Sequence, residues 1–508
     1  MTLTRRYVER TRVPRSFFNP MNGNFYSEVS KKHRLGEGST LLQAVEVCDT
    51  PMLYLMPMPK GTYQNPTSIY PAKADWEKSG IQVHAWYGNN AGIIEHKGRK
   101  VSINALSRWF DVRVEDTLSD VILALSVLEK LLNEHLPING HTCPIYLQET
   151  PTRTAMDLVR RKLPFGAKYE ALPSDVESIL MRNFSQQRNE LLSHGYETAT
   201  DVHLYDGRFM YASCLRNVPV GSILNDTTDR YLPYVAGFYR VTARVPDNWQ
   251  HIGLLPCKNT ASHNQQQGST YPRIPGTVFE SWCSDKELRL ALDYGWECNI
   301  QERILWPQTQ VRKKEVGEEV YKSLGQDPLR YFGEGLTTIR QTVLPTLELP
   351  IRQKELIGEG LRNLLMHGVG GMHASEKYQD REVTDLQFLP DEIPFENVFE
   401  IGDGTYRYKE PKIRTEWEQE QFQPHWIQYL YCDCKTKVTK FVLEHIPFEQ
   451  CLAIRTDGVW TLGPCEVPLD TGKVGVFREK SLIKRGPFPY PKNNKDIEKL
   501  MRTAKEGE

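Results

Sequence analysis

The sequence predicts an α+β protein built from several domains. With 508 residues, the chain exceeds the length of one ordinary domain. Hydrophobic residues make up 39% of it and charged residues 25%, values typical of a globular protein with enough apolar residues for a core. Short β-type runs broken by glycine, proline and asparagine dominate residues 40–110, whereas residues 117–136 and 424–446 are predicted to be helical.

The composition argues against a membrane-spanning or secreted protein. No run of 18 apolar residues occurs, and the basic N-terminus lacks the apolar segment of a secretory signal. The ten cysteines form no Cys-x-x-Cys pair, which favours reduced cysteines over a disulfide or zinc framework. We therefore expect a cytoplasmic protein with no membrane partner.

Positive charge gathers at the two ends of a nearly neutral chain. Residues 1–34 carry eight Lys/Arg and two Glu, and residues 473–508 carry ten Lys/Arg and five Asp/Glu. A local basic field is sufficient for a surface that follows phosphates. Solvated tails would have the same composition, so charge alone leaves both interpretations open.

In the N-terminal half, helices are predicted from apolar spacing and capping residues. Ser119 or Asp120 is expected to cap the helix over 117–136, and Thr152 the next one. The predicted strands are 41–47, 81–86 and 92–94, and the predicted helices are 117–136, 154–162 and 174–192.

The middle of the chain alternates strands and short helices. Ser284 and Gly295 are the expected start and stop of one of these helices. The predicted strands are 201–205, 234–245 and 297–305, and the predicted turn or helical segments are 211–217 and 285–294.

Beyond residue 310 the sequence is mainly helical. Residues 315–366 are predicted as two or three helical pieces, the last of which, 355–366, is expected to end at Gly368, Gly370 and Gly371. Residues 373–420 are polar and interrupted by prolines. After the helix over 424–446, residues 451–462 are predicted as a hairpin with Asp457-Gly458 as its two-residue turn.

Two aspartates lie at predicted strand ends, Asp206 after 201–205 and Asp457 in the hairpin. Taken singly, aspartate at such positions more often caps a helix or forms a turn. The residues that surround Asp206 and Asp457 favour metal binding over capping or turn formation. We predict that the two carboxylates meet in space and bind divalent metal.

Tyr205-Asp206-x4-Tyr211-x-Ser213 followed by Pro219-x-Gly221 resembles the first palm motif of family B DNA polymerases. The closest similarity is to the protein-primed branch of phages, linear plasmids and other mobile elements. Phe209, Met210 and Ala212 replace the family's Ser, Leu and Pro. The family's third motif, Asp-Thr-Asp-Ser, is similar to Arg455-Thr456-Asp457-Gly458, which keeps the second aspartate and replaces the first with arginine.

Other family segments follow in the expected order over about residues 150–490. The fingers motif, Lys-x3-Asn-Ser-x-Tyr-Gly, is represented by Arg362 and Gly370, with Met366, His367 and Val369 between them. The resemblance implies a polymerase right hand with an antiparallel-sheet palm, helical fingers and a reduced thumb. The implied divisions are a shrunken exonuclease-like region (1–150), palm (151–310 and 373–472), fingers (311–372) and a truncated thumb with a basic tail (473–508).

The resemblance also implies roles for single residues. Asp206, Asp457 and the Gly207 carbonyl would bind two Mg²⁺ (or Mn²⁺) ions roughly 4 Å apart. Tyr211 would lie under the incoming sugar, although a core tyrosine is the simpler interpretation. Arg362, with Arg352 or Lys354, would hold the triphosphate, unless this helix face is merely solvated. The residues implied in DNA contact are Arg455, Thr456, Gly458, Lys484 and Arg485.

The N-terminal third lacks the Asp-x-Glu strand of a proofreading exonuclease. Glu46-Val47-Cys48-Asp49 has the wrong spacing, and helix capping explains Asp120 better than metal binding does. We therefore expect no proofreading.

Two functions remain open at this point. One is an active DNA polymerase that adds dNTPs to a primer 3′-hydroxyl, with template-primer DNA, dNTPs and a terminal protein or accessory replication subunit as partners, in the host-cell cytoplasm if a virus or plasmid encodes it. The other is a catalytically inactive polymerase-fold subunit for DNA binding or assembly, which Arg455 favours. A primase or RNA-templated enzyme is a third alternative.

Overall fold

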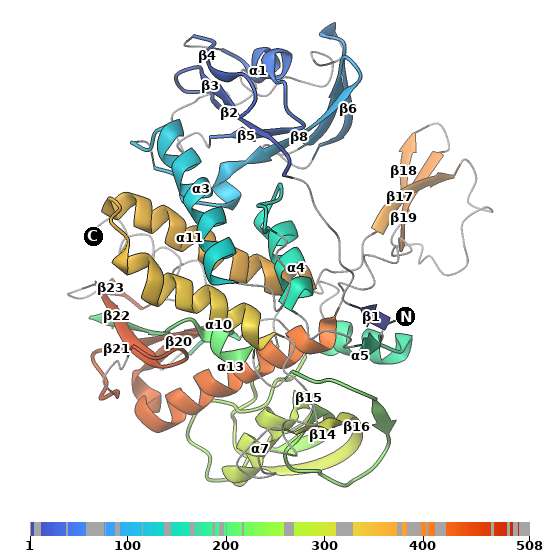
Figure 1. Cartoon of the computed structure of the whole chain (residues 1–508). Coiled ribbons are helices and arrows are strands. Elements are labelled where there is room, and N and C mark those ends of the chain that lie inside the picture. Colours follow the sequence, from blue (N-terminus) through green and yellow to red (C-terminus); the bar gives the residue numbers. More distant parts are fainter. Residues whose placement is uncertain are drawn as a thin grey trace.

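A computed structural model of the chain contains several separate sheets joined by a helical layer (Figure 1). The mixed α and β composition predicted from the sequence is confirmed. The structure describes residues 2–4, 12–36, 39–56, 76, 78–86, 92–113, 115–136, 144–162, 168–170, 172–184, 188–192, 198–199, 201–215, 218–258, 269–310, 329–372, 378–383, 398–402, 405–411, 423–468, 472–484, 488–490 and 496.

The N-terminal region is a seven-stranded mixed sheet in which β2, β5 and β8 run parallel. Its strand order is β4-β3-β2-β5-β8-β7-β6. The strands are β2 (Arg15–Asn19), β3 (Asn24–Ser27), β4 (Lys31–Arg34), β5 (Met52–Leu55), β6 (Ile81–Trp86), β7 (Gly92–His96) and β8 (Arg99–Ala105). The predicted strands at 81–86 and 92–94 are confirmed as β6 and β7.

The predicted strand at 41–47 is wrong, because this segment is helix α1 (Leu41–Val47). Thr40 and Gln43 form a capping box that satisfies backbone N–H groups of the first turn. Leu41, Ala44 and Val45 then recur at helical spacing and pack into the core of the sheet. An apolar run this short is compatible with a strand or a helix, and the capping box at Thr40 favours the helix.

Helix α3 (Leu118–His135) confirms the helix predicted at 117–136. Its N-cap is Thr117 rather than Ser119 or Asp120. The Asp120 carboxylate completes a capping box by accepting a hydrogen bond from the Thr117 N–H at 2.9 Å. The short 3₁₀ helix η3 (Leu106–Arg108) connects β8 to the loop before α3.

The central sheet has five antiparallel strands in the order β10-β20-β21-β12-β22. They are β10 (Asn189–Leu191), β12 (Val202–Gly207), β20 (Cys451–Arg455), β21 (Gly458–Leu462) and β22 (Phe477–Lys484). The predicted strand at 201–205 is confirmed. Strands separated by about 250 residues of sequence thus lie side by side, and β22 joins the sheet from the segment expected to form the thumb.

Helix α13 (Pro424–His445) packs against the central sheet. The rings of Phe441 on α13 and Phe477 on β22 are stacked, with their centroids 4.0 Å apart. The helix predicted at 424–446 is confirmed. Residues 174–192, predicted as one helix, instead form α5 (Ser174–Asn183) and, after a break, strand β10. The 3₁₀ helix η8 (Phe448–Gln450) leads from α13 into β20.

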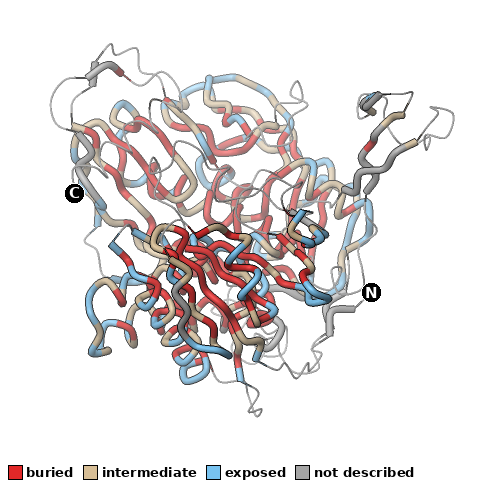
Figure 2. Tube along the Cα trace, turned by 90° about the horizontal axis from the view of Figure 1, so that it is seen from above, coloured by how far each residue is buried: buried red, intermediate tan, exposed pale blue. Residues whose placement is uncertain are grey.

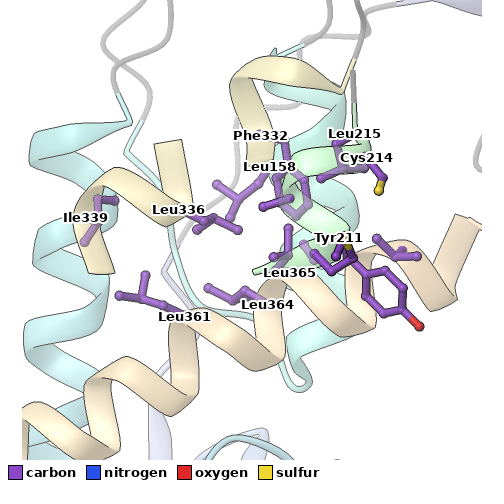
Figure 3. Close-up of a cluster of buried hydrophobic side chains, with 14 of the residues drawn as sticks. Leu158, Tyr211, Cys214, Leu215, Phe332, Leu336, Ile339, Leu361, Leu364 and Leu365 are labelled. Carbon is purple, nitrogen blue, oxygen red and sulfur yellow. The ribbon is translucent and has the colours of Figure 1, made fainter. Parts of the chain in front are cut away.

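A layer of helices connects the central sheet to the N-terminal sheet. Its members are α4 (Pro151–Lys162), α6 (Met210–Cys214), α10 (Arg330–Thr338), the π-helical turn η4 (Ile339–Val343), the 3₁₀ turn η5 (Leu344–Thr346) and α11 (Ile351–Met372). Figure 3 shows the leucine-rich core where Leu158, Phe332 and Leu364 meet beside Tyr211. Figure 2 shows buried segments passing through the body of the molecule.

Helix α11 does not end at the glycines, contrary to the prediction, but continues to Met372. A side chain at Gly368 would lie 2.9 Å from the Phe332 ring and 3.0 Å from Ala155 Cβ. One at Gly371 would lie 2.9 Å from a methyl group of Thr152. The missing side chains therefore allow close packing between α11 and its neighbours, and this gain overrides the low helix propensity of glycine.

Two further sheets lie outside this body. Strands β13 (Leu224–Asp226), β16 (Glu297–Gln310), β14 (Val235–Arg244) and β15 (Val278–Ser284) form one of them, with α7 (Asp285–Asp293) packed against it. The Ser284 cap and the positive φ of Gly295 confirm the predicted limits of α7. Strands β17 (Tyr378–Val383), β19 (Thr405–Pro411) and β18 (Val398–Gly402) form a sheet that projects from the body (Figure 1).

Two short strand pairs complete the fold, β1 (Thr2–Thr4) with β9 (Lys168–Glu170), and β11 (Thr198–Ala199) with β23 (Phe488–Pro489). Among the described residues, no helix has the length and apolar character needed to cross a membrane.

Candidate active site

Asp206 and Asp457 come together at one end of the central sheet. Strand β12 pairs with β21 in a register that places Asp206 opposite Gly458, the residue after Asp457. The backbone N–H of Gly207 donates a hydrogen bond to the Asp457 carbonyl at 3.1 Å. The register of two neighbouring strands therefore fixes the two carboxylates on adjacent segments of backbone.

Asp457 lies in a tight turn whose residues differ from those predicted. Arg455 pairs with Gly458, so the two turn residues are Thr456 and Asp457 rather than Asp457 and Gly458. Thr456 has a φ of +57°, which is unfavourable for a β-branched residue. Its N–H donates to the Arg188 carbonyl at 2.9 Å, so a backbone contact from outside the hairpin holds the strained residue.

Arg188 is fully buried beneath this turn. Its guanidinium donates to the Thr439 hydroxyl at 2.8 Å and to the Glu190 carboxylate, and it lies 3.9 Å from the centre of the Tyr271 ring. These contacts tie the turn to α13 and to the loop before β15. The position of Asp457 thus rests on a buried charge with several partners.

The two carboxylates repel each other in a partly dry environment. Burial raises the pKa of Asp457 to about 6, and the negative charge of Asp206 adds to the rise. The charges of Lys480 and Arg362 act in the opposite direction and lower the pKa of Asp457.

The Lys480 ammonium lies 3.5 Å from a carboxylate oxygen of Asp206. Lys480 falls where β22 shifts register against β12, and such irregularities redirect side chains beside functional sites.

Tyr211 lies on α6, five residues after Asp206 in the chain. It is buried, and its ring meets Tyr431 of α13 edge to face at a centroid distance of 5.8 Å. Burial raises the pKa of its hydroxyl, and nearby groups that include Asp457 add to the effect. In Figure 3 the hydroxyl points away from the leucine cluster. Tyr211 is therefore part of the core and also a neighbour of the aspartate pair.

Three arginines that come from different elements gather beside the aspartates. Burial lowers the pKa of Arg340 to about 10, and the positive charges of Arg362 and Arg478 lower it further, while Glu359 opposes them. The Arg340 guanidinium lies 4.6 Å from the centre of the Phe209 ring. Within the part of the chain that the structure describes, none of the three guanidinium groups has a carboxylate partner within ion-pair distance. Such a cluster is suited to a multiply charged anion.

Sequence reasoning did not assign Arg340 or Arg478 to the site. Arg340 belongs to the π-helical turn η4, and π-helical turns are frequent at functional sites, but the sequence shows no pattern that predicts the turn. Arg478 faces Asp206 only because β22 pairs with β12. Because residues 473–508 contain many Lys and Arg residues, the sequence does not distinguish Arg478 from the others.

Arg352 and Lys354, expected near the triphosphate, make other contacts. The Arg352 guanidinium donates to the Asp116 carboxylate at 2.7 Å and to the Asp111 carbonyl at 2.8 Å. The Lys354 ammonium donates to the Pro345 carbonyl at 2.8 Å. Arg362, in contrast, lies close enough to Asp457 to lower its pKa.

The residues expected to contact DNA occupy two places. Arg455, Thr456 and Gly458 surround Asp457 at the hairpin end. Lys484 is the last residue of β22 and pairs with Val202, at the opposite end of β12 from Asp206. Arg485 lies outside the described residues.

The donor set fits a divalent cation with hard oxygen ligands. Asp206 and Asp457 supply carboxylates and Gly207 supplies a carbonyl, which are ligands that Mg²⁺ and Mn²⁺ accept together with substrate oxygens. A divalent cation would also relieve the repulsion that raises the pKa of Asp457. Among the described residues, no group of three or more His, Cys, Asp or Glu side chains is placed to hold a metal, so any ion here would rely on these two carboxylates.

In the described part of the N-terminal region, the two carboxylates that come together, Glu28 and Glu129, are each paired with Arg12 and Arg15. Its three parallel strands end at Asn19, Leu55 and Ala105, and ligands of such sheets bind beyond these carboxyl ends. In the described part of this region, neither the last residue of these strands nor the one that follows is acidic. Asp116 and Asp120 are both engaged in structural contacts, with Arg352 and with the α3 cap respectively.

Comparison with known proteins shows similarity in structure but not in sequence. No protein-family model and no curated protein matches the chain. Its structure is similar to that of phi29 DNA polymerase complexed with primer-template DNA and incoming nucleotide substrates, with 11% identity, a TM-score of 0.56, and coverage of 94% of this chain and 86% of that one. For phi29 DNA polymerase complexed with primer-template DNA alone, the identity is 12% and the TM-score 0.56, with coverage of 94% of this chain and 85% of that one.

A third structure, phi29 DNA polymerase complexed with single-stranded DNA, has 11% identity, a TM-score of 0.52, and coverage of 93% of this chain and 85% of that one. The chain therefore has a polymerase fold, as the resemblance of its motifs implied.

Proposed function

We propose that the protein is a DNA-directed DNA polymerase that transfers deoxynucleotides to a primer 3′-hydroxyl with the help of divalent metal. The observation that carries this proposal is the meeting of Asp206 and Asp457 across paired strands, next to three arginines without carboxylate partners in the described structure. A pair of acidic ligands beside a phosphate-binding cluster is the arrangement that nucleotidyl transfer requires.

In this proposal each group has one task. Asp206, Asp457 and the Gly207 carbonyl hold Mg²⁺ or Mn²⁺, which, when bound, neutralises negative charge that develops on the attacking and leaving oxygens. Arg362, Arg340 and Arg478 bind the phosphates of the incoming nucleotide, in place of Arg352 and Lys354. Tyr211 forms the floor under the sugar, where its ring leaves no room for a 2′-hydroxyl.

The same proposal assigns the regions of the fold. The central sheet with α13 forms the palm, and α10 to α11 form the fingers. The thumb is taken as reduced, because β22, which lies in the segment expected to form it, belongs to the palm sheet. The N-terminal sheet is an exonuclease-like domain without proofreading, which its non-acidic strand ends support. The protein-primed branch of family B remains the proposed relationship, with template-primer DNA as the partner.

Primer extension with Mg²⁺ or Mn²⁺ tests the proposal directly. Wild-type protein should extend a primed template with dNTPs, and Asp206→Asn and Asp457→Asn should each abolish extension. Asp247→Asn is the matched control, since Asp247 is exposed on a loop and bonds only to Arg244 among the described contacts. Extension that survives both active-site substitutions would refute the proposal.

A catalytically inactive DNA-binding or assembly subunit is the second candidate. Two observations favour it: Lys480 lies beside Asp206, and Arg455 replaces an aspartate of the family motif. If wild-type protein binds primed DNA but extends it with neither metal, and Asp457→Asn binds DNA equally well, the inactive subunit is correct.

A further inference from the structure

A polar face of α11 is attached to one short segment of the N-terminal region. Arg352 bonds to the Asp116 carboxylate, and Glu359 accepts a hydrogen bond from the Asp111 N–H at 2.6 Å. Asn363 donates to the Trp109 carbonyl at 2.9 Å. Further contacts are the Arg113–Glu355 ion pair at 3.2 Å and the hydrogen bond from Gln353 to the Asp120 carbonyl at 3.1 Å.

The spacing of these contacts along α11 shows that they form one stripe. Arg352, Glu355, Glu359 and Asn363 recur every three or four residues, so they share one face of the helix. Apolar packing lies beside the stripe. A side chain at Gly360 would come within 2.8 Å of Leu128 and 3.0 Å of Phe110. The segment 109–120 therefore sets both the position and the rotation of α11.

Another part of α11 lies close to Arg340. Gly358 lies against Arg340, whose Nε would be 3.6 Å from a side chain there, and Arg362 affects the pKa of both Arg340 and Asp457. Arg362 lies ten residues after Arg352, or about 15 Å along the helix. A small rotation of α11 about its contact with segment 109–120 would therefore displace the Arg362 guanidinium from the cluster.

The ion pair between Asp116 and Arg352 is the best protected of these contacts. The Asp116 side chain is 1% exposed and that of Arg352 is 21% exposed. The Arg352 side chain lowers the pKa of Asp116 against the opposing effect of burial. The Arg113–Glu355 pair, in contrast, is about half exposed and contributes little restraint.

We propose that Asp116 and Arg352 are positioning residues for the polyphosphate site, and that the N-terminal region acts as a brace that holds α11 so that Arg362 meets Arg340 and Arg478. This inference rests on the proposed function for the identity of the ligand. It gives the N-terminal region a role in nucleotide binding in place of proofreading. Neither residue touches the nucleotide.

The test compares Asp116→Asn, Arg352→Gln and the double variant with wild-type protein. Asp226→Asn is the matched control, because it breaks another arginine–aspartate pair, with Arg303 at 2.7 Å, in the sheet that packs against α7. Three quantities are measured: KM and kcat for dNTP in primer extension, the affinity for inorganic tripolyphosphate by calorimetry, and hydrogen exchange of the α11 amides.

The brace predicts that each single variant raises the KM for dNTP about tenfold with kcat changed less than twofold. Tripolyphosphate affinity should fall by a similar factor, and α11 amides should exchange faster. The double variant should be no worse than the single ones, because both act through the same contact. Asp226→Asn should leave KM, affinity and α11 exchange unchanged.

Two results would overturn the brace: unchanged tripolyphosphate affinity in Asp116→Asn, or an equal loss in Asp226→Asn. Wild-type protein that binds no tripolyphosphate would also refute it. Failure of the proposed function has a different signature. Wild-type protein would then extend no primer, while tripolyphosphate binding and its loss in Asp116→Asn would still be measured.

Discussion

The backbone N–H of Gly207 donates to the carbonyl of Asp457 at 3.1 Å, which joins two residues 250 positions apart in the chain. This bond extends the β12–β21 pairing by one residue beyond Asp206 and Gly458, so strand register fixes how close the backbones of Asp206 and Asp457 lie. A site of this kind is preorganised before substrate or metal binds.

The first prediction concerns the pH dependence of stability. The pKa of Asp457 is about 6 in the folded state, above the ordinary value, so ionisation of Asp457 destabilises the fold. Its cost is absent below pH 4 and complete above pH 6. Without divalent metal, Asp457→Asn should therefore raise the free energy of unfolding at pH 8 by about 3 kcal/mol and leave it nearly unchanged at pH 4. Urea denaturation at the two pH values measures this, and equal effects at both would contradict it.

The second prediction concerns Lys480 and metal affinity. The Lys480 ammonium lies 3.5 Å from Asp206 and competes with a divalent cation for that carboxylate. Lys480→Gln should therefore tighten Mn²⁺ binding about twofold to fivefold, a modest factor because the lysine is half exposed. Calorimetric titration with Mn²⁺ measures the change. Lys440→Gln, which removes an exposed lysine from α13, is the control, and weaker binding by Lys480→Gln would show that Lys480 is not a competitor.

The third prediction concerns the arginine cluster. Arg340→Gln, Arg362→Gln and Arg478→Gln should each raise the KM for dNTP about tenfold, the effect of losing one charged contact to phosphate. Arg244→Gln, which breaks the ion pair between the end of β14 and Asp247 on the following loop, should leave KM unchanged. Steady-state primer extension with varied dNTP measures all four. If only Arg362→Gln has an effect, Arg340 and Arg478 lie outside the nucleotide site.

The fourth prediction compares two glycines of α11. Gly368→Ala places a methyl group 2.9 Å from Phe332 and should destabilise the protein by about 1–3 kcal/mol through overpacking. Gly370 has open space around it, so Gly370→Ala should stabilise by about 0.5–1 kcal/mol through helix propensity. Urea denaturation of both variants provides the comparison. A destabilised Gly370→Ala would mean that α11 is not helical at this position.

Local sequence was sufficient for elements whose signals are complete within a few residues. Ser284, Glu287 and Gly295 delimit α7 as predicted, because a capping box and a positive-φ stop act locally. Local sequence was insufficient where a contact with a distant part of the chain determines the conformation of a segment. Gly368 and Gly371 predict a helix end, but α11 continues past both glycines because it packs closely against α4 there. At 41–47 the short apolar run predicts a strand, but the capping box of Thr40 and Gln43 starts a helix there.

The sequence by itself determined the mixed α and β composition and the resemblance to a polymerase, and it led to Asp206 and Asp457 as the proposed metal ligands, because the motif resemblance rests on residue types in a fixed order and spacing. Only the tertiary structure decided which cations join them. Arg340 and Arg478 reach the site through the packing of a π-helical turn and the register of β22, whereas Arg352 turns to Asp116. The charge of an arginine is set by its sequence, but its partner is set by strand pairing and helix rotation, which depend on contacts between distant parts of the chain.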